Sequence, residues 1–312
     1  MTRSSKDIST SCSTPPAEPR PSRLAELDRW MHSNPWHPRV LPMIAFLVML
    51  LIIGQGRTHL GLISYPFLYS LQAVIVGWLL WRYRKLTPEL TVSFHWLAVP
   101  TAILLTAGWI GLGWLMQGEF ALRWEAIVAG EPVGKIGAEQ GHYFARMADE
   151  SGGLYWSSLV LRLLGMSLLV PLFEELFVRS ACLRGLHSPR KTGLGILQFL
   201  EDLPVIGDWT AETKLGRQAG REAPLFTEQL RAWPVGKLTA FGVAASTVIF
   251  TINHLFRDWP GAVLCGLVWC WLLWWTNRGG RRMGLGPIVW SHGLTNALLW
   301  AYCVWSGDWQ FM

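Results

Sequence analysis

Two adjacent carboxylates stand at the end of a long apolar run, in the sequence Pro-Leu-Phe-Glu-Glu-Leu-Phe-Val-Arg over residues 171–179. Ionised carboxylates are costly in lipid or buried protein, by at least ~2.5 kcal/mol each on insertion scales. Glu175 and Arg179 are four residues apart, so on a helix they share a face and can neutralise each other. Glu174 is rotated by about 100° from its neighbour and has no cation at that spacing. The spacing therefore predicts a structural role for Glu175 and leaves Glu174 free for chemistry.

Two histidines and an asparagine lie in later apolar segments. His254 follows Phe250 by four residues, and His292 precedes Asn296 by four, so the last two share one helix face. Ionisable residues within a membrane normally face the bundle interior or a water-filled cavity. Together with the free glutamate, these side chains supply a carboxylate, two imidazoles and an amide from three separate helices.

This set of groups suits hydrolysis of an amide bond. A buried glutamate held beside a histidine can take a proton from water as a general base. The other histidine and the asparagine can donate hydrogen bonds to the oxyanion that develops on the attacked carbonyl. No serine or cysteine is placed as an obvious nucleophile, which favours direct attack by water. Zinc is the alternative, because Glu174, His254 and His292 could hold it and leave one position for water, although no HExxH motif is present.

The composition places these residues in a membrane. Of 312 residues, 51% are hydrophobic and 15% are charged, and the mean hydropathy is +0.27. Several apolar stretches exceed ~18 residues, which predicts an all-α, polytopic transmembrane helical bundle of about seven or eight spans. The net charge of +6 does not indicate nucleic acid, because the bases fall in loops between apolar segments. The five cysteines lack CxxC or secreted-framework spacing, which argues against disulfides and a thiolate metal site.

Seven spans are expected, at about residues 40–56, 60–81, 94–116, 154–173 (continuing into the glutamate pair), 235–256, 259–276 and 283–305. Bases gather in every second connection, which predicts a cytoplasmic N-terminus and an external C-terminus. An eighth segment is the alternative, since the polar insertion at 187–234 could dip into the bilayer. In this arrangement His254 lies near the outer end of its helix and His292 near the inner start of its own. Catalysis therefore requires short, tilted or broken helices around a cavity.

We divide the chain into three regions. Residues 1–39 are predicted to be a cytoplasmic tail, disordered through Ser22, in which residues 23–32 could form a short amphipathic helix at the membrane surface. Residues 40–153 hold three spans and an acidic loop. Residues 154–312 form the predicted catalytic bundle and carry the polar insertion.

Three motifs resemble a known family. Glu-Glu-x-x-x-Arg at 174–179, Phe-x-x-x-His at 250–254 and His-x-x-x-Asn at 292–296 occur in the order found in the CPBP family of intramembrane proteases, which includes the type II CAAX prenyl endopeptidases. The resemblance covers about residues 154–306. The ending His-Gly-Leu-Thr-Asn-Ala-Leu-Leu, with Gly-Asp-Trp-Gln close behind, also resembles an exosortase-associated bacterial subgroup called CAAX prenyl protease-related. The first three spans and the insertion depart from the family, which leaves the substrate open.

The resemblance implies a role for each motif. Glu174 would activate water together with His254, while the neighbouring glutamate and Arg179 would hold the geometry. His292 and Asn296 would form the oxyanion hole. The family is described both as metalloproteases and as glutamate-dependent enzymes without metal. We favour no cofactor, because the histidine and the asparagine have roles without zinc.

The resulting prediction is a CAAX-type intramembrane protease that hydrolyses a peptide bond of a membrane-associated protein or peptide. The expected location is the bacterial inner membrane. The expected partners are the lipid bilayer, the substrate and an exosortase sorting system, with no nucleic acid. Two rivals stay open. One is a non-proteolytic scaffold or immunity-type protein that retains the motifs. The other is a proton-coupled transporter with Glu174 as its relay, although no repeat with broken helices is visible.

Overall fold

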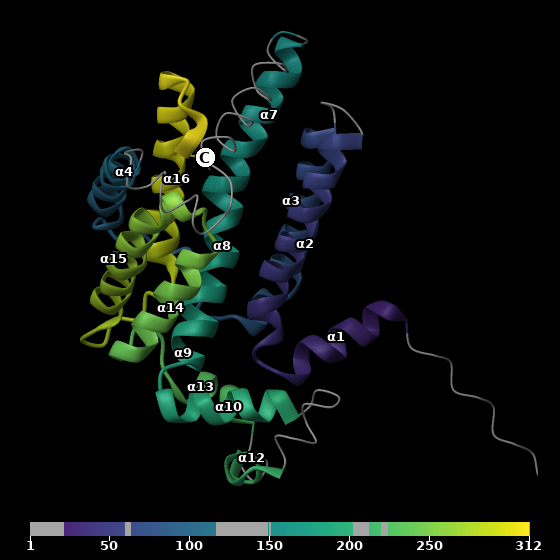
Figure 1. Cartoon of the computed structure of the whole chain (residues 1–312), viewed down its shortest axis with the longest axis vertical. Coiled ribbons are helices and arrows are strands. Elements are labelled where there is room, and N and C mark those ends of the chain that lie inside the picture. The colour runs from purple at the N-terminus through teal and green to yellow at the C-terminus, as the bar shows by residue number, and fades with distance from the viewer. Residues whose placement is uncertain are drawn as a thin grey trace, which may run out of the picture.

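The computed structural model of the chain describes residues 22–59, 64–116, 149, 151–201, 212–219 and 224–311. Within these ranges every regular element is a helix and no strand occurs. The predicted all-α bundle is therefore confirmed (Figure 1). The predicted disordered tail up to residue 21 and nearly all of the acidic loop at 117–153 lie outside the described ranges.

All seven predicted spans are helical. They are α2 (His37–His59), α3 (Ser64–Arg82), α4 (Ala98–Leu115), the composite helix Gly152–Gly185, α14 (Ala240–Ile252), α15 (Trp259–Asn277) and α16 (Gly286–Ser306). Four described stretches are long and apolar enough to cross a membrane: His37–Gly54, Ala98–Leu115, Gly152–Gly185 and Phe256–Asn277. Membrane crossing by α3, α14 and α16 stays a prediction.

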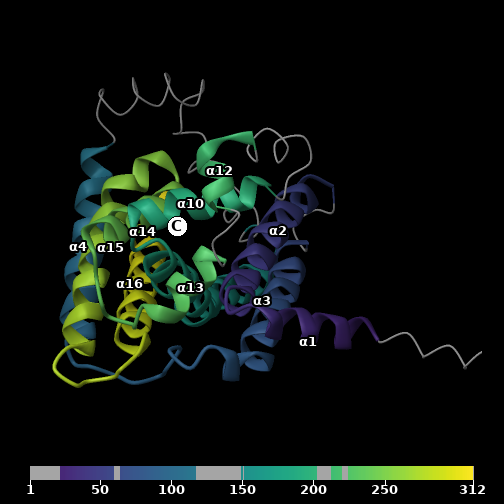
Figure 2. The same cartoon turned by 90° about the horizontal axis from the view of Figure 1, so that it is seen from below.

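The composite helix Gly152–Gly185, called the central helix below, lies between two groups of helices. α2 and α3 pack against one side of it, and α14 and α16 pack against the other, with α15 and α4 beyond them (Figure 1). Figure 2 shows the same division from below, with α4, α15 and α16 on one side and α2 and α3 on the other. Phe173 of the central helix, Phe250 and Trp269 belong to one buried cluster. In a membrane, such packing holds helices together through van der Waals contact.

Short helices cross one end of the bundle. They are α1 (Arg23–Ser33), α10 (Pro189–Glu201), α12 (Lys214–Ala219) and α13 (Leu225–Ala232), while η1 (Arg84–Leu86), η4 (Phe256–Asp258) and η5 (Trp309–Phe311) are single 3-10 turns. Figure 1 shows α1, α10 and α13 at this end, and α16 ending near the opposite one. The described part of the polar insertion therefore adds helices across the bundle and no further candidate span.

The expected amphipathic helix near the N-terminus is present as α1. The Ser22 hydroxyl caps it by accepting a hydrogen bond from the backbone N–H of Ala25 at 3.2 Å. Asp28 of α1 accepts two hydrogen bonds from Arg82 at the end of α3, at 2.9 and 2.6 Å. These hydrogen bonds, with the charge of Arg82, lower the pKa of Asp28. The charge pair fixes α1 across the end of α3.

Two π-helical segments interrupt the central helix on either side of the glutamate pair. The helix consists of α7 (Gly152–Leu164), η2 (Gly165–Leu169), α8 (Val170–Glu175), η3 (Leu176–Cys182) and α9 (Leu183–Gly185), and η2 and η3 are the π segments. Such insertions are rare in helices and are frequent at functional sites. The two π segments therefore mark the six residues of α8 between them as a candidate functional region.

Candidate active site

His292 lies between the two glutamates. Its Nδ1 donates to Oε1 of Glu175 at 2.8 Å, and its Nε2 is 3.7 Å from Oε2 of Glu174. The first contact is a hydrogen bond, and the second is beyond hydrogen-bond range. The Glu175 side chain is fully buried, whereas 13% of the Glu174 side chain is exposed. Glu174 is thus the carboxylate that a third polar group can approach.

Glu175 is held from its other side by Arg179. Arg179 Nε lies 3.3 Å from Oε2 of Glu175, and both side chains are fully buried. The ion pair expected from their four-residue spacing is therefore present. The guanidinium carbon also lies 4.7 Å from the ring centroid of Phe250 and 5.5 Å from that of Trp269. These aromatic faces stabilise the buried cation.

Asn296 satisfies a backbone carbonyl that Pro171 leaves unpaired. In the wide turns of η2, the N–H of Val170 bonds to the carbonyl of Gly165, five residues back. The next bond of this kind would join residue 171 to the carbonyl of Met166, but proline has no N–H. The Asn296 amide donates to that Met166 carbonyl at 2.8 Å instead. One amide hydrogen of Asn296 is therefore used for structure, and the other has no partner among the residues that the structure describes.

His254 lies two residues beyond the end of α14. That helix has 13 residues and is only about 20 Å long, less than the ~30 Å of a bilayer core. A helix of this length cannot reach both surfaces of a bilayer core. The Phe250 ring is 4.6 Å from the His254 ring and 6.3 Å from the His292 ring, between centroids. The shortness of α14 is what brings His254 and His292 to one region from opposite ends of their helices.

The observed contacts differ from the predicted pairing in one respect. Within the part of the chain that the structure describes, Glu174 contacts His292 and makes no recorded contact with His254. His254 Nδ1 donates to the carbonyl of Phe250 at 2.8 Å, and its ring packs edge-on against Trp109 of α4. The reason lies in the packing, because α16 lies against α8 whereas α14 lies against η3 further along the central helix.

Two residues that contact or pack beside His292 were not among the residues predicted from the sequence. Trp269 of α15 stacks on His292 with ring centroids 4.3 Å apart, and its Nε1 donates to Ser291 at 3.1 Å. It is one of 20 tryptophans, and nothing in its spacing marks it. Gly293 lies so close to the carbonyl of Ser167 that a Cβ would collide with it. Its position next to His292 was the one available hint of close helix packing.

The residues considered for zinc do not form a ligand set in this arrangement. Among the described residues, no group of three or more His, Cys, Asp or Glu side chains is placed to hold a metal ion. His292 uses Nδ1 for Glu175, and His254 uses Nδ1 for a backbone carbonyl.

Residues 156–298 match the family described as type II CAAX prenyl endopeptidase, Rce1-like. This segment is an Rce1-like domain. The resemblance to the CPBP family is thereby confirmed over these residues, and the family indicates a protease. The Rce1-like domain includes every candidate residue named above: Glu174, Glu175, Arg179, His254, His292 and Asn296.

The Rce1-like domain begins within the central helix and ends within α16, so helices α1 to α4 lie outside it. Searches of curated proteins and of solved structures each gave no match to the chain. Assignment to the exosortase-associated subgroup, and the exosortase link with it, stays a prediction.

Proposed function

We propose that the chain is an intramembrane endopeptidase that hydrolyses a peptide bond of a membrane-associated protein or peptide. The observation that carries this proposal is the buried Glu174–His292–Glu175 arrangement within an Rce1-like domain. Bacterial inner membrane with a cytoplasmic N-terminus is the proposed setting, supported by the alternating distribution of bases along the chain.

Glu174 is the proposed general base. It is the more exposed of the two carboxylates, and its 3.7 Å separation from His292 Nε2 suits a polar group bridging both. Water in that position attacks the carbonyl carbon of the substrate while Glu174 takes its proton. The carbon–nitrogen bond then breaks, and Glu174 passes the proton to the leaving amine. Proton and charge balance without a covalent intermediate on the enzyme.

His292 and Asn296 are the proposed oxyanion donors. The hydrogen bond from His292 Nδ1 to Glu175 sets the ring orientation, so that Nε2 faces Glu174. As an imidazolium, His292 can donate from Nε2 to the developing oxyanion. Asn296 uses one N–H for the Met166 carbonyl and keeps the other for the same purpose. Fixed donors of this kind stabilise the transition state without reorganising.

His254 is proposed as a second acceptor for the attacking water. Because its Nδ1 donates to the Phe250 carbonyl, the neutral ring carries a lone pair on Nε2. Its indirect contact with His292 through the Phe250 ring supports a shared site. His254 thus keeps the role expected from the family motifs, which is to activate water together with Glu174. In addition, His292 orients Glu174.

The test compares cleavage of co-expressed membrane proteins by wild type, Glu174→Gln and a control, Glu228→Gln, which alters an exposed glutamate of α13. Metal content of each detergent-purified protein is measured alongside. Cleavage that needs Glu174 and proceeds without stoichiometric metal supports the proposal. Stoichiometric zinc with Glu174-dependent cleavage would keep the peptidase and replace the metal-free mechanism. A wild type that cleaves no substrate would favour the scaffold or immunity-type alternative.

A further inference from the structure

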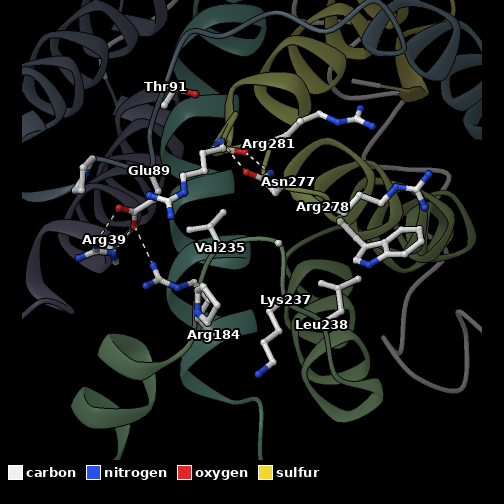
Figure 3. A pocket seen from close by; sticks show the side chains of 17 residues that line it. Arg39, Glu89, Thr91, Arg184, Val235, Lys237, Leu238, Asn277, Arg278 and Arg281 are labelled. Carbon is white, nitrogen blue, oxygen red and sulfur yellow. Dashed lines mark hydrogen bonds and ion pairs between the residues drawn. The ribbon is translucent and has the colours of Figure 1, made fainter.

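A basic cavity of about 1110 Å³ lies beside the loops at one end of the bundle (Figure 3). It is lined by the segment before α4, the segment before α14, and the connection between α15 and α16. Among its lining side chains are six bases and one acid, namely Arg39, Arg184, Lys237, Arg278, Arg281, Arg282 and Glu89. None of the candidate catalytic residues lines it, so the cavity is separate from the site described above.

The wall made by the α15–α16 connection is held firmly in place. Asn277 at the end of α15 donates to the carbonyl of Gly284 at 3.0 Å and accepts from its N–H at 2.9 Å. The N–H of Leu285 donates to the carbonyl of Glu89 at 2.8 Å. Gly284 has a φ of 63°, and a Cβ there would collide with the same Glu89 carbonyl. The turn that carries the arginines is therefore docked on the segment before α4.

The single acid of the cavity is already neutralised. Arg39 donates to both carboxylate oxygens of Glu89, at 2.6 and 2.9 Å, and the Ser180 hydroxyl also donates to it. Arg184 lies 3.3 Å from the same carboxylate. Burial acts to raise the pKa of Glu89, but the hydrogen bonds and charge of Arg39, with the Ser180 hydroxyl, hold it below its ordinary value. Figure 3 shows this paired group on one side of the cavity.

The remaining bases have no acidic partner among the described residues. Figure 3 shows Arg278 and Arg281 on the side of the cavity opposite Glu89, with Lys237 on a third side. The Arg278 guanidinium stacks on the Trp274 and Trp275 rings, at 4.7 and 3.4 Å from their centroids. The cavity thus holds an excess of positive charge that nothing within the described chain balances.

The cavity lies at the same membrane depth as one terminus of each of three candidate spans. Arg39 is two residues into His37–Gly54, Arg184 is the last residue but one of Gly152–Gly185, and Asn277 ends Phe256–Asn277. Lipid headgroups lie at this level, just outside the hydrocarbon core. Trp274 lines the same cavity, and tryptophan is enriched at this interface.

We propose that this cavity binds the phosphate-bearing headgroup of an anionic phospholipid. Unpaired bases surrounding an open volume suit a headgroup, since basic pockets at the ends of membrane helices attract phosphate. The bases lie where the candidate spans end, which is the depth of lipid headgroups in a bilayer. This position favours a lipid over a soluble phosphate compound, whose binding site could lie anywhere on the surface. The proposal does not depend on the peptidase assignment, because no catalytic residue takes part in it.

The test uses the detergent-purified full chain and native mass spectrometry, with phosphatidylglycerol or phosphatidylcholine added in increasing amounts. The test variant is Arg281→Gln with Arg282→Gln, since both side chains are exposed and have no recorded partner. The matched control is Arg190→Gln with Lys191→Gln, which removes the same charge from two exposed bases of α10 outside the cavity. Thermal unfolding checks that both variants are folded.

We expect wild type to bind phosphatidylglycerol in preference to phosphatidylcholine. The arginine variant should weaken phosphatidylglycerol binding by roughly 30-fold, from the usual contribution of two bases near an anionic headgroup. The control variant should bind as wild type does, and added inorganic phosphate should not displace the lipid. Equal binding by the two variants would overturn the proposal. Displacement by inorganic phosphate, or by an acidic peptide, at lipid-like concentration would also overturn it and assign the cavity to a soluble anion or a protein.

Discussion

The Nδ1 atom of His292 lies 2.8 Å from Oε1 of Glu175, although 117 residues separate them in the chain. This hydrogen bond joins α16 to the central helix and turns the other ring nitrogen of His292 towards Glu174. Arg179 holds Glu175 from behind. The buried glutamate therefore contacts both His292 and Arg179, and we propose that it positions the two side chains.

Removing Arg179 should destabilise the protein. Arg179→Ala leaves Glu175 as a buried charge without its cation, which costs about 3–5 kcal/mol. We expect a lower yield and a lower thermal midpoint in detergent. The double variant Glu175→Gln with Arg179→Met removes both charges and should recover much of this loss. An abundant, thermally unchanged Arg179→Ala protein would show that the pair does not stabilise the fold.

The structural and catalytic roles of Asn296 can be separated. Asn296→Ala leaves the Met166 carbonyl unpaired, which costs about 1–3 kcal/mol. Pro171→Ala supplies the missing N–H, so adding it to Asn296→Ala should restore the thermal midpoint. It should not restore cleavage, because loss of an oxyanion donor lowers kcat by about 10²–10³. Strictly additive thermal effects of the two substitutions would contradict the proposed backbone link.

Close packing of α16 on η2 should be sensitive to a single methyl group. Gly293→Ala places a Cβ against the Ser167 carbonyl, and overpacking of this kind costs about 1–3 kcal/mol. Because His292 is the preceding residue, we also expect reduced cleavage. Gly111→Ala is the control, since the same methyl group in α4 meets no atom within 4 Å. Equal thermal midpoints and cleavage rates for the two variants would contradict this packing.

Stability should depend on pH through Glu89. The pKa of Glu89 is lower in the folded protein than its ordinary value of 4.5, so its ionised form favours the folded state. This stabilisation is present above that ordinary value and is lost as the pH falls through the lower, folded-state pKa. Glu89→Gln should therefore lower the thermal midpoint at neutral pH and flatten its decline in acid. Glu228→Gln, an exposed change, should leave the curve as in wild type.

The helices could be predicted from the apolar runs, but their ends could not. The expected span at 235–256 is helical only over Ala240–Ile252. It begins where the Thr239 hydroxyl caps it, and it ends at Ile252, just before Asn253 and His254. Hydropathy measures composition and does not detect such ends. Because the helix ends at Ile252, His254 packs on the Phe250 ring, which also lies against His292.

The pair Glu175–Arg179 could be predicted because both residues lie on one helix, where spacing determines contact. The contact of His292 with both glutamates could not, because it depends on which helix packs against α8. Asn296 is an intermediate case. Pro171 within an apolar run signals an unpaired carbonyl, but only the fold shows which side chain satisfies it.

The central claim is that Glu174 activates water for peptide hydrolysis. The most direct measurement is the cleavage rate of one membrane-associated substrate by purified Glu174→Gln beside wild type, with thermal midpoints recorded for both. We expect the rate to fall by a factor of about 10²–10⁴, which is the contribution of a general base, at an unchanged thermal midpoint. A folded Glu174→Gln protein that cleaves as fast as wild type would contradict it.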